Sequence, residues 1–339
     1  MARAPGHVEG GNLGEFELIA RYFAPLAKDA AALALRDDAA VLRPPESREI
    51  VISCDTVVAG VHFLVDDPPD TIGHKALAVS LSDLAAKGAK PYVYLLALAL
   101  PAEPAPAWLE AFSSGLRALQ EQAGICLVGG DTTRTPGPLT ITITALGLVP
   151  QGHAVLRLGA KPGDRLYVSG SIGGSCLGLR LLKEPALRTA WGLSEEQTAF
   201  LIGRYRRPEP RNNLALLVRN FAQGAIDVSD GLIGDIEKLA RVSHVGAVIE
   251  VARVPFSPAA RQALQREPKL LGTVLTAGDD YEIVAAVPEG SAGGFEAEAA
   301  TKDASFIMIG RVEGQAGEVT VLGPDGSTLS LERRGFSHF

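Results

Sequence analysis

The sequence predicts a mixed α/β fold divided into two domains. Segments with strand-type and helix-type patterns alternate through residue 150, and the second half of the chain repeats that alternation. The chain has 339 residues, and because a single hydrophobic core rarely grows past about 250 residues, two cores are expected. We therefore expect an N-terminal domain over residues 1–150 and a C-terminal domain over residues 151–339, with a glycine-rich junction at 151–179.

The N-terminal half begins with a predicted amphipathic helix over residues 14–27. A β-branched strand follows from residue 49 and is expected to end at Asp55, which leaves His62 in a loop. The next helix has Asp70 as its predicted N-cap. That helix is predicted over residues 70–91, and a second helix over residues 105–124. Residues 92–100 are predicted as a buried strand and residues 138–149 as an alternating strand.

The C-terminal half is expected to contain a short strand at residues 165–169 and a glycine-rich entry to a helix. Residues 225–246 are predicted as a strand, an acidic turn and a helix, and residues 247–256 as a strand and a turn. The stretches 275–288 and 306–312 each add a strand. This order of elements supports the α/β interpretation.

Composition excludes several classes of protein. A formal net charge of −7 gives no basic surface for nucleic acid, and no apolar run reaches the roughly 18 residues of a membrane span. Three cysteines without CxxC spacing argue against a thiolate zinc site and fit a reducing compartment. No signal or transit peptide is predicted, so a cytoplasmic location is expected.

Acidic residues cluster beside Gly, Ser or Thr rather than beside Lys, which sets them apart from a solvated helix face. Gathered carboxylates repel each other unless a cation holds them, and Mg²⁺ is the natural one. At Gly129 and Gly130 the main chain would let a phosphate approach while Asp131 holds the metal. The clusters are Asp37-Asp38, Cys54-Asp55-Thr56, Ser82-Asp83, residues 129–132, residues 227–231 and Asp279-Asp280.

Each cluster also has an ordinary explanation. An Asp before a helix is usually an N-cap, and Asp-Gly is a routine turn pair. Caps do not account for Asp83 inside an Ala/Leu helix, and Asp230 with Ser229 stands where a helix N-terminus favours anions. The sequence contains no P-loop, GxSxG, HExxH or HRD motif. "GSIGGSCLG" is only a weak match to a dinucleotide loop.

Ten ordered segments resemble the thiamine-monophosphate kinase family, from residue 14 to residue 339. They include "RDDAAVL", "CDTVVAGVHF", "HKALAVSLSDLAAKGAKP", "VGGDTTR", "IDVSDGLIGDI", "GDDYE" and "GFSHF". The resemblance implies an ATP-dependent kinase that converts thiamine monophosphate to thiamine diphosphate by direct in-line transfer, with no covalent or general-base residue. It also implies a two-domain PurM-like fold, shared with aminoimidazole ribonucleotide and selenophosphate synthetases, whose N-terminal domain forms a barrel-like homodimer interface.

The resemblance also implies roles for particular residues. Several Mg²⁺ ions bridge the phosphates in the family, and a K⁺ requirement is left open. The positions that match the metal shell are Asp38, Ser53, Cys54 through its carbonyl, Asp55, Asp83, Asp131, Asp227 and Asp230. Those that match nucleotide contacts are Gly130, Asp131, Arg157 and Ser229. Those that match contacts to thiamine phosphate are His62, Asp279 and Phe336.

Three positions depart from the family pattern: Arg36 replaces a glycine, Asp279 a glutamate, and Phe336 a Tyr or Trp. Two alternatives stay open. One is another ATP-using synthetase of the same superfamily, although "HVEGGNLGEF" lacks the Cys and Lys expected of a selenophosphate synthetase. The other is a non-catalytic nucleotide or Mg²⁺ sensor on the same scaffold.

Overall fold

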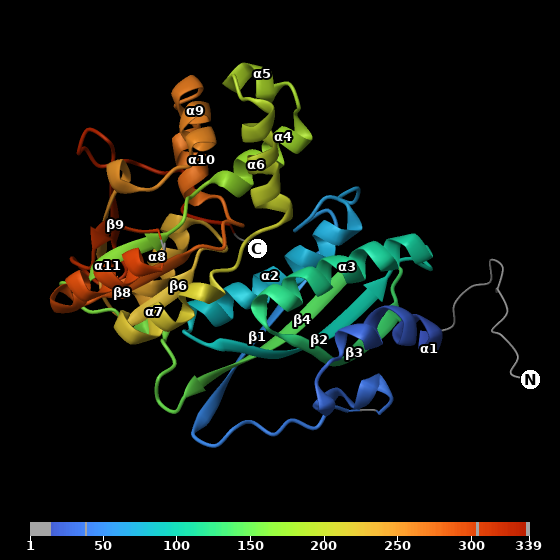
Figure 1. The fold of residues 1–339 in the computed structure, drawn as a ribbon. Coiled ribbons are helices and arrows are strands. Elements are labelled where there is room, and N and C mark those ends of the chain that lie inside the picture. Colours follow the sequence, from blue (N-terminus) through green and yellow to red (C-terminus); the bar gives the residue numbers. More distant parts are fainter. Residues whose placement is uncertain (1–14, 38, 303–304, 337–339) are drawn as a thin grey trace, which may run out of the picture.

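The computed structural model describes residues 15–37, 39–302 and 305–336 and contains two β-sheets (Figure 1). One sheet is built from residues 48–150 and the other from residues 165–322. Helices pack against both sheets, so the predicted mixed α/β architecture is confirmed. None of the helices in the described part of the chain is long and apolar enough to cross a membrane.

The first sheet has four strands in the order β1-β4-β2-β3. Their bounds are β1 Arg48–Val58, β4 Thr140–Pro150, β2 Lys90–Leu100 and β3 Cys126–Arg134. β4 runs antiparallel to both β1 and β2, and β3 runs parallel to β2. Within the described residues β1 and β3 are therefore the two edges of this sheet.

Helices α2 (Pro69–Ala86) and α3 (Pro106–Ala123) cover one face of the first sheet (Figure 1). Leu77, Leu81 and Leu84 of α2 are completely buried there, because they recur at helical spacing on the side that meets the sheet. The predicted N-terminal helix is present as three successive turns, α1 Glu15–Leu18, a π turn Ile19–Phe23 and a 3₁₀ turn Ala24–Leu26. A further 3₁₀ segment, Ala30–Leu35, leads toward β1.

Two local predictions in this half are wrong. β1 continues past Asp55 to Val58 because its pairing with β4 extends that far. Asp70 does not cap α2; the cap position is Pro68, and the Asp70 carboxylate pairs with Arg207. The Gly-Gly-Asp segment, for which no element was predicted, lies inside β3.

The second sheet has six strands in the order β10-β7-β9-β5-β8-β6 and is mixed. Their bounds are β10 Val319–Leu322, β7 Ala247–Glu250, β9 Phe306–Arg311, β5 Arg165–Ser169, β8 Ile283–Val287 and β6 Gly224–Asp227. The predicted strands of this half are confirmed, and β10 is an addition that the sequence pattern did not indicate.

Helices lie on both faces of the second sheet. α8 (Leu232–Val242) packs on one face, and α7 (Ala215–Phe221) with α11 (Ala292–Thr301) packs on the other. A separate helical group extends from this sheet with its own apolar core (Figure 1). It consists of α4 Gly174–Lys183, α5 Leu187–Trp191, α6 Glu195–Arg206, α9 Pro258–Arg266 and α10 Leu270–Thr276.

α2 also joins the two halves. Ala85 and Ala86 at its end pack with Val218, Ala225 and Ile283 of the C-terminal half. The loop after α6 reaches back to the same helix, where the Pro208 carbonyl lies 2.9 Å from His74 Nε2. Residues of α2 are therefore held against both sheets.

Candidate active site

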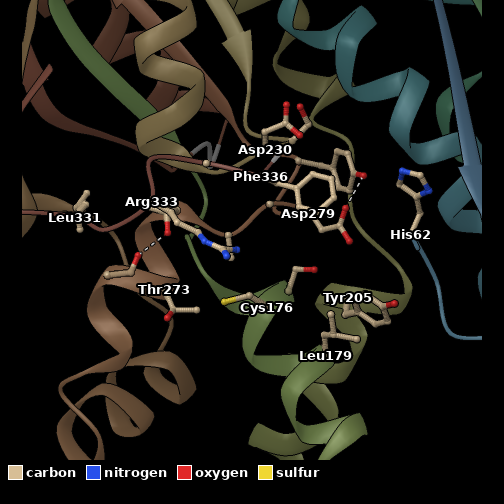
Figure 2. Close-up of a pocket in the computed structure, with 18 of the residues that line it drawn as sticks. His62, Cys176, Leu179, Tyr205, Asp230, Thr273, Asp279, Leu331, Arg333 and Phe336 are labelled. Carbon is tan, nitrogen blue, oxygen red and sulfur yellow. Dashed lines mark hydrogen bonds between the residues drawn. The ribbon is translucent and has the colours of Figure 1, made fainter. Parts of the chain in front are cut away.

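A cleft of about 1210 Å³ is lined by residues from both halves (Figure 2). One wall comes from the end of β1 and the loop that follows it. The other comes from α4, α10, the loops after β6 and α10, and the segment 329–336. The predicted site residues that line it are Cys54, Asp55, His62, Ser229, Asp230, Asp279 and Phe336.

Acidic and hydroxyl groups of β1 and α2 meet beside this cleft. Ser53 and Asp55 share one face of β1 because they are two residues apart. Ser53 Oγ lies within hydrogen-bond distance of Asp55 Oδ2, at 3.0 Å, and of the Asp83 carboxylate, and it donates its single proton to one of them at a time. Ser80 Oγ donates to Asp55 Oδ2 at 2.8 Å. Asp83, the acid that interrupts an apolar helix, thus faces β1.

Asp227, the last residue of β6, adds a third acid from the C-terminal half. Ser82 Oγ donates to Asp227 Oδ2 at 2.9 Å. Burial raises the pKa of Asp227 well above its ordinary value, and the charge of Asp83 raises it further. Burial, followed by the charge of Asp83, also raises the pKa of Asp55. Asp55, Asp83 and Asp227, called the acid cluster below, therefore repel one another.

The acid cluster has no protein cation in direct contact. None of the ion pairs found within residues 15–37, 39–302 and 305–336 includes one of its members. Lys87 acts only at longer range: burial lowers its pKa to about 8, while the charges of Asp227 and Asp83 oppose that shift. Its Nζ donates to the Ala225 carbonyl at 2.7 Å instead.

The acid cluster suits Mg²⁺ as one part of a coordination shell. No group of three or more His, Cys, Asp or Glu side chains in the described part of the chain is spaced to hold a metal ion unaided. Mg²⁺ commonly takes one or two carboxylates and completes its octahedron with water and phosphate oxygens. Carboxylates that repel one another beside serine hydroxyls offer such oxygens, and a divalent cation would relieve their repulsion.

The loop between β6 and α8 differs from the sequence-based expectation. Its N–H groups were expected to be open to an anion, but the Asp235 carboxylate accepts from the N–H of Asp230 at 2.9 Å and of Gly231 at 3.1 Å. Lys238 Nζ pairs with Asp230 and lies 2.7 Å from Asp235 Oδ1. Asp230 therefore lines the cleft with a lysine already beside it.

The wall that contains Asp279 is fixed by contacts from both halves. Lys75 Nζ of α2 lies 2.7 Å from Asp279 Oδ2, and the Tyr281 hydroxyl donates to Asp279 Oδ1 at 2.9 Å. The Phe336 N–H donates to the Asp230 carbonyl at 2.8 Å, which places the Phe336 ring in the cleft near Asp279 (Figure 2). On the opposite wall His62 Nδ1 accepts from the Val58 N–H at 3.0 Å.

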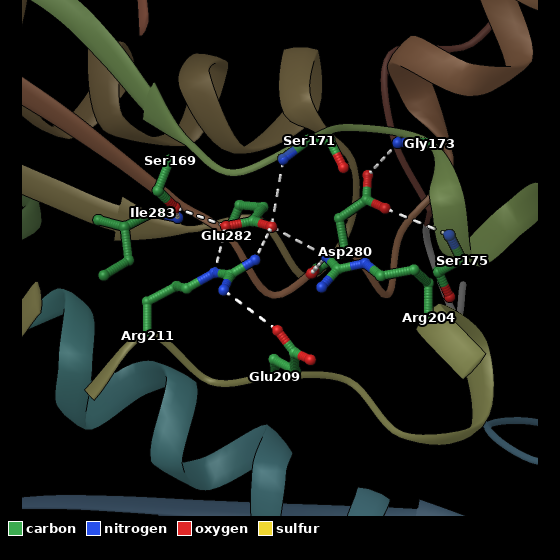
Figure 3. Close-up of polar contacts among 10 residues, drawn as sticks. All are labelled: Ser169, Ser171, Gly173, Ser175, Arg204, Glu209, Arg211, Asp280, Glu282 and Ile283. Atoms are coloured by element: carbon green, nitrogen blue, oxygen red, sulfur yellow. Dashed lines mark hydrogen bonds and ion pairs between the residues drawn. The ribbon is translucent and has the colours of Figure 1, made fainter. Parts of the chain in front are cut away.

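A buried polar network lies behind Asp279 (Figure 3). Glu282 is completely buried and pairs with Arg204 at 2.9 Å and with Arg211 at 2.6 Å. Asp280 accepts from the Gly173 N–H at 2.7 Å and so occupies the N-terminus of α4. Burial raises the pKa of Asp280 to about 7, against the opposing charge of Arg204. Within residues 279–282, the Asp279 side chain therefore lies at the cleft, and the side chains of Asp280 and Glu282 are buried.

Gly130 and Asp131 are not brought to the cleft of this chain. The register places Thr56, Thr142, Ala97 and Asp131 in one row across β1, β4, β2 and β3. Asp131 is therefore three strand spacings, about 14 Å, from β1. The Gly130 main chain packs so closely on β2 that a Cβ would overlap the Leu96 carbonyl oxygen. Strand packing, rather than room for a phosphate, accounts for this glycine in the chain.

Arg157 is exposed in a 3₁₀ turn, Arg157–Gly159, and is not among the residues that line the cleft, whereas Asp38 lies outside the described residues. The sequence analysis overlooked Lys75, Lys87, Tyr205 and Tyr281. Lys75 carried a signal, because a lysine in the apolar stretch of α2 must find a partner if it is buried.

Comparisons with known proteins find relatives that match both halves of the chain. The family models for the N-terminal and C-terminal domains of AIR synthase related protein match residues 36–149 and 161–322. Thiamine-monophosphate kinase of Escherichia coli (strain K12) is 41% identical to this chain over 328 residues, which are 96% of this chain and 98% of the relative.

Two solved structures are similar over most of the chain. Thiamine-monophosphate kinase from Stenotrophomonas maltophilia K279a has a TM-score of 0.80 and 40% identity, over 90% of this chain and 94% of that chain. AaThiL complexed with AMPPCP and TMP has a TM-score of 0.75 and 29% identity, over 96% of this chain and 97% of that chain.

Proposed function

The chain belongs to the thiamine-monophosphate kinase family, and from that premise we propose how its cleft joins two phosphate substrates. It is an ATP-dependent kinase of thiamine biosynthesis that phosphorylates thiamine monophosphate to thiamine diphosphate. AMPPCP, which the related AaThiL structure contains together with TMP, is an analogue of ATP. The two ligands of that relative correspond to the two substrates of this reaction.

One observation carries the arrangement that we propose. The acid cluster stands beside the cleft, and in the part of the chain that the structure describes no Lys or Arg forms an ion pair with it. Carboxylates alone would repel ATP and thiamine monophosphate, so several Mg²⁺ ions belong there. When bound, Mg²⁺ neutralises phosphate charge and orients the reacting oxygens. The ligands that we propose in this chain are Ser53, the Cys54 carbonyl, Asp55, Asp83, Asp227 and Asp230, while Asp38 stays a prediction from the sequence.

The residues of the chain mainly bind and orient. Ser229 and Arg157 are proposed nucleotide contacts, and His62, Asp279 and Phe336 are proposed to hold thiamine monophosphate. The attacking oxygen belongs to a phosphate that is already anionic near neutral pH, so no side chain needs to remove a proton. Direct in-line transfer then depends on alignment and on offsetting a repulsion of several kcal/mol between the two anions.

We propose a homodimer in which Gly130 and Asp131 enter the site from a second subunit. The face of the first sheet away from α2, which Ala32 and Leu35 cover only in part, exposes Ile52 by 63% and Leu95 by 39%, and both sheet edges are open within the described residues. Pairing β3 of one copy with β1 of another would close two such sheets into one barrel. That pairing would bring Asp131 of the second subunit next to β1, which carries Cys54 and Asp55.

Three further expectations belong to this proposal. The domains divide near residue 150, into 1–150 and 151–339, and the enzyme works in the cytoplasm, where its cysteines stay reduced. A K⁺ requirement is tested by replacing KCl with NaCl in the assay described next.

The test uses purified protein with ATP, MgCl₂ and thiamine monophosphate, and follows ADP and thiamine diphosphate together. We expect equimolar ADP and thiamine diphosphate, no reaction after chelation by EDTA, and no diphosphate when unphosphorylated thiamine replaces the monophosphate. ATP binding without formation of the diphosphate would instead favour a sensor or another acceptor. Light scattering at the assay concentration tests the dimer, and a monomer with full activity would refute the shared site.

A further inference from the structure

Lys75 is a buried cation behind the wall of the cleft. It projects from α2, its side chain is 2% exposed, and its Nζ lies 2.7 Å from Asp279 Oδ2. The same ammonium stands 3.9 Å from the centroid of the Tyr205 ring, a distance that gives a favourable cation–π contact. Lysine is almost never buried to this degree without a partner, and here the partner is a residue that lines the cleft.

Asp279 is held on both of its carboxylate oxygens. Lys75 engages Oδ2, and the Tyr281 hydroxyl donates to Oδ1 at 2.9 Å. Burial keeps the pKa of Tyr281 well above its ordinary value, so the hydroxyl remains a donor at neutral pH. Asp279 is still 26% exposed toward the cleft, which leaves oxygen lone pairs available to a ligand.

The backbone around Asp279 adopts a conformation that non-glycine residues rarely take. Asp279 has φ of 72° and Tyr281 has φ of 52°, both in the left-handed region. Such residues persist only where their surroundings determine the conformation, and they concentrate at functional sites. The N–H groups of Asp279 and Tyr281 donate to the carbonyls of Ser229 and Val228, at 2.9 Å and 2.8 Å. The main chain and the carboxylate are therefore both fixed.

We propose that Lys75 is a positioning residue for recognition of thiamine monophosphate: it fixes the Asp279 carboxylate and cancels its charge. Asp279 then meets the substrate as a neutralised hydrogen-bond acceptor, suited to the N–H donors of the aminopyrimidine ring, without repelling the nearby dianionic phosphate. This inference rests on the proposed contact between Asp279 and the substrate.

Lys75 does not bind the substrate phosphate itself. Its ammonium is enclosed by the Asp279 carboxylate and the Tyr205 ring, and the 2% exposure leaves no approach for a phosphate oxygen. The pair also spans the two halves, since Lys75 belongs to α2 while Asp279 follows α10. Lys75 therefore ties the substrate wall to the helix that supplies Asp83.

Lys75→Met tests the proposal, because methionine fills nearly the same volume without the charge. We expect the KM for thiamine monophosphate to rise about 10-fold or more, kcat to change less than about threefold, and the Kd of an ATP analogue to stay within about twofold, since binding of one substrate is weakened equally in the ground state and in the transition state. Lys28→Met is the matched control, because it removes an exposed lysine paired with Glu121 at 2.8 Å, and its kinetics should equal those of the wild type.

A double-mutant cycle with Asp279→Asn separates positioning from a general structural effect. If Lys75 acts through Asp279, the double variant should have the KM of Asp279→Asn within about twofold. Multiplicative losses, or a fall in kcat at unchanged KM, would overturn the proposal. If the wild type fails to phosphorylate thiamine monophosphate, the proposed function is wrong, whereas normal wild-type turnover with an unchanged KM in Lys75→Met refutes the role of Lys75 alone.

Tyr281→Phe is a second variant that tests the proposal if Lys75→Met does not fold. It removes the hydrogen bond to Asp279 Oδ1 and leaves the lysine in place. The expected result is a KM for thiamine monophosphate about three- to tenfold higher, as for the loss of one typical hydrogen bond, with kcat retained. An unchanged KM in this variant would contradict the requirement for a fixed Asp279 carboxylate.

Discussion

The acids on the two sides of the cleft differ in what balances their charge. On the C-terminal side Asp230 has Lys238, Asp279 has Lys75, and Glu282 has two arginines. On the side of β1 and α2, Asp55 and Asp83 contact serine hydroxyls and, among the residues that the structure describes, form no ion pair; Asp227 at the end of β6 is bonded to Ser82. Protein cations balance the first group, and we propose that a cation from solution balances the second. Asp230 is a proposed Mg²⁺ ligand that already contacts a lysine.

Carboxylates that pair with a protein cation and carboxylates that do not have different roles in this protein. A buried acid paired with arginine holds the chain in one arrangement, because separating the pair leaves an unpaired charge in the interior. Asp55 and Asp227 lack such partners, and burial together with the charge of Asp83 raises their pKa values. A divalent cation bound there would favour their ionised forms. The lack of a lysine or arginine partner among the described residues therefore supports the metal site that we propose at the acid cluster.

Asp83→Asn should have the largest effect, since it removes the acid that interacts with both other members of the cluster. We expect kcat/KM to fall about 10³-fold, while stability without Mg²⁺ stays equal or rises because a repulsive charge is gone. In thermal melts MgCl₂ should raise the Tm of the wild type and leave that of the variant nearly unchanged. A variant that retains activity within tenfold would place the metal elsewhere.

Arg211→Met should affect stability rather than chemistry. It leaves Glu282 fully buried with Arg204 as its remaining cation, and we expect the free energy of unfolding in urea to fall by about 3 kcal/mol. The control is Arg165→Met, whose partner Glu289 is exposed, and we expect its loss to change the free energy of unfolding much less, because solvent screens an exposed ion pair. Equal losses in the two variants would mean that burial does not distinguish these pairs.

Asp280→Asn should have the smallest effect on turnover and should change the pH dependence of stability. Burial raises the pKa of Asp280 to about 7 in the folded protein, so the folded state keeps a proton that the unfolded chain releases between about pH 4 and 7. The contribution of Asp280 to stability therefore falls as pH rises through that window and is constant above it.

Melting curves from pH 5 to 8 measure this change. The Tm of the wild type, relative to that of Asp280→Asn, should decline with rising pH up to about pH 7, since the variant has no proton to release at this position. A difference in Tm that does not vary with pH would show that Asp280 is ionised throughout.

Local pattern was sufficient for most of the secondary structure. The strand at residues 165–169 and the helices α2 and α3 follow from periodicity in side chains that pack on a neighbouring layer. The errors occurred where a distant partner decides the outcome. β1 passes Asp55 because β4 pairs with it, and Asp70 pairs with Arg207 of the other half instead of capping α2.

The sequence predicted only part of the candidate site, because the rest depends on contacts between distant segments. Asp83 was noticeable as an acid in an apolar helix, and it does lie next to Ser53 and face β1. Lys75 stands in the same helix, but its partner Asp279 is 204 residues away in the sequence. Nothing local indicated that the two would meet, nor that Asp131 would lie on the edge of the sheet opposite β1.

The sequence by itself determined the periodic elements, the acidic positions and, through ordered motifs, the family. Only the tertiary structure decided which acids meet a lysine or arginine and which remain without one. Charge pairing depends on distances of a few ångströms between segments far apart in the chain, and these distances follow from strand order and from the packing of α2 between two sheets. Side-chain periodicity indicates which face of a helix or strand is buried, but it does not indicate which other segment packs against that face.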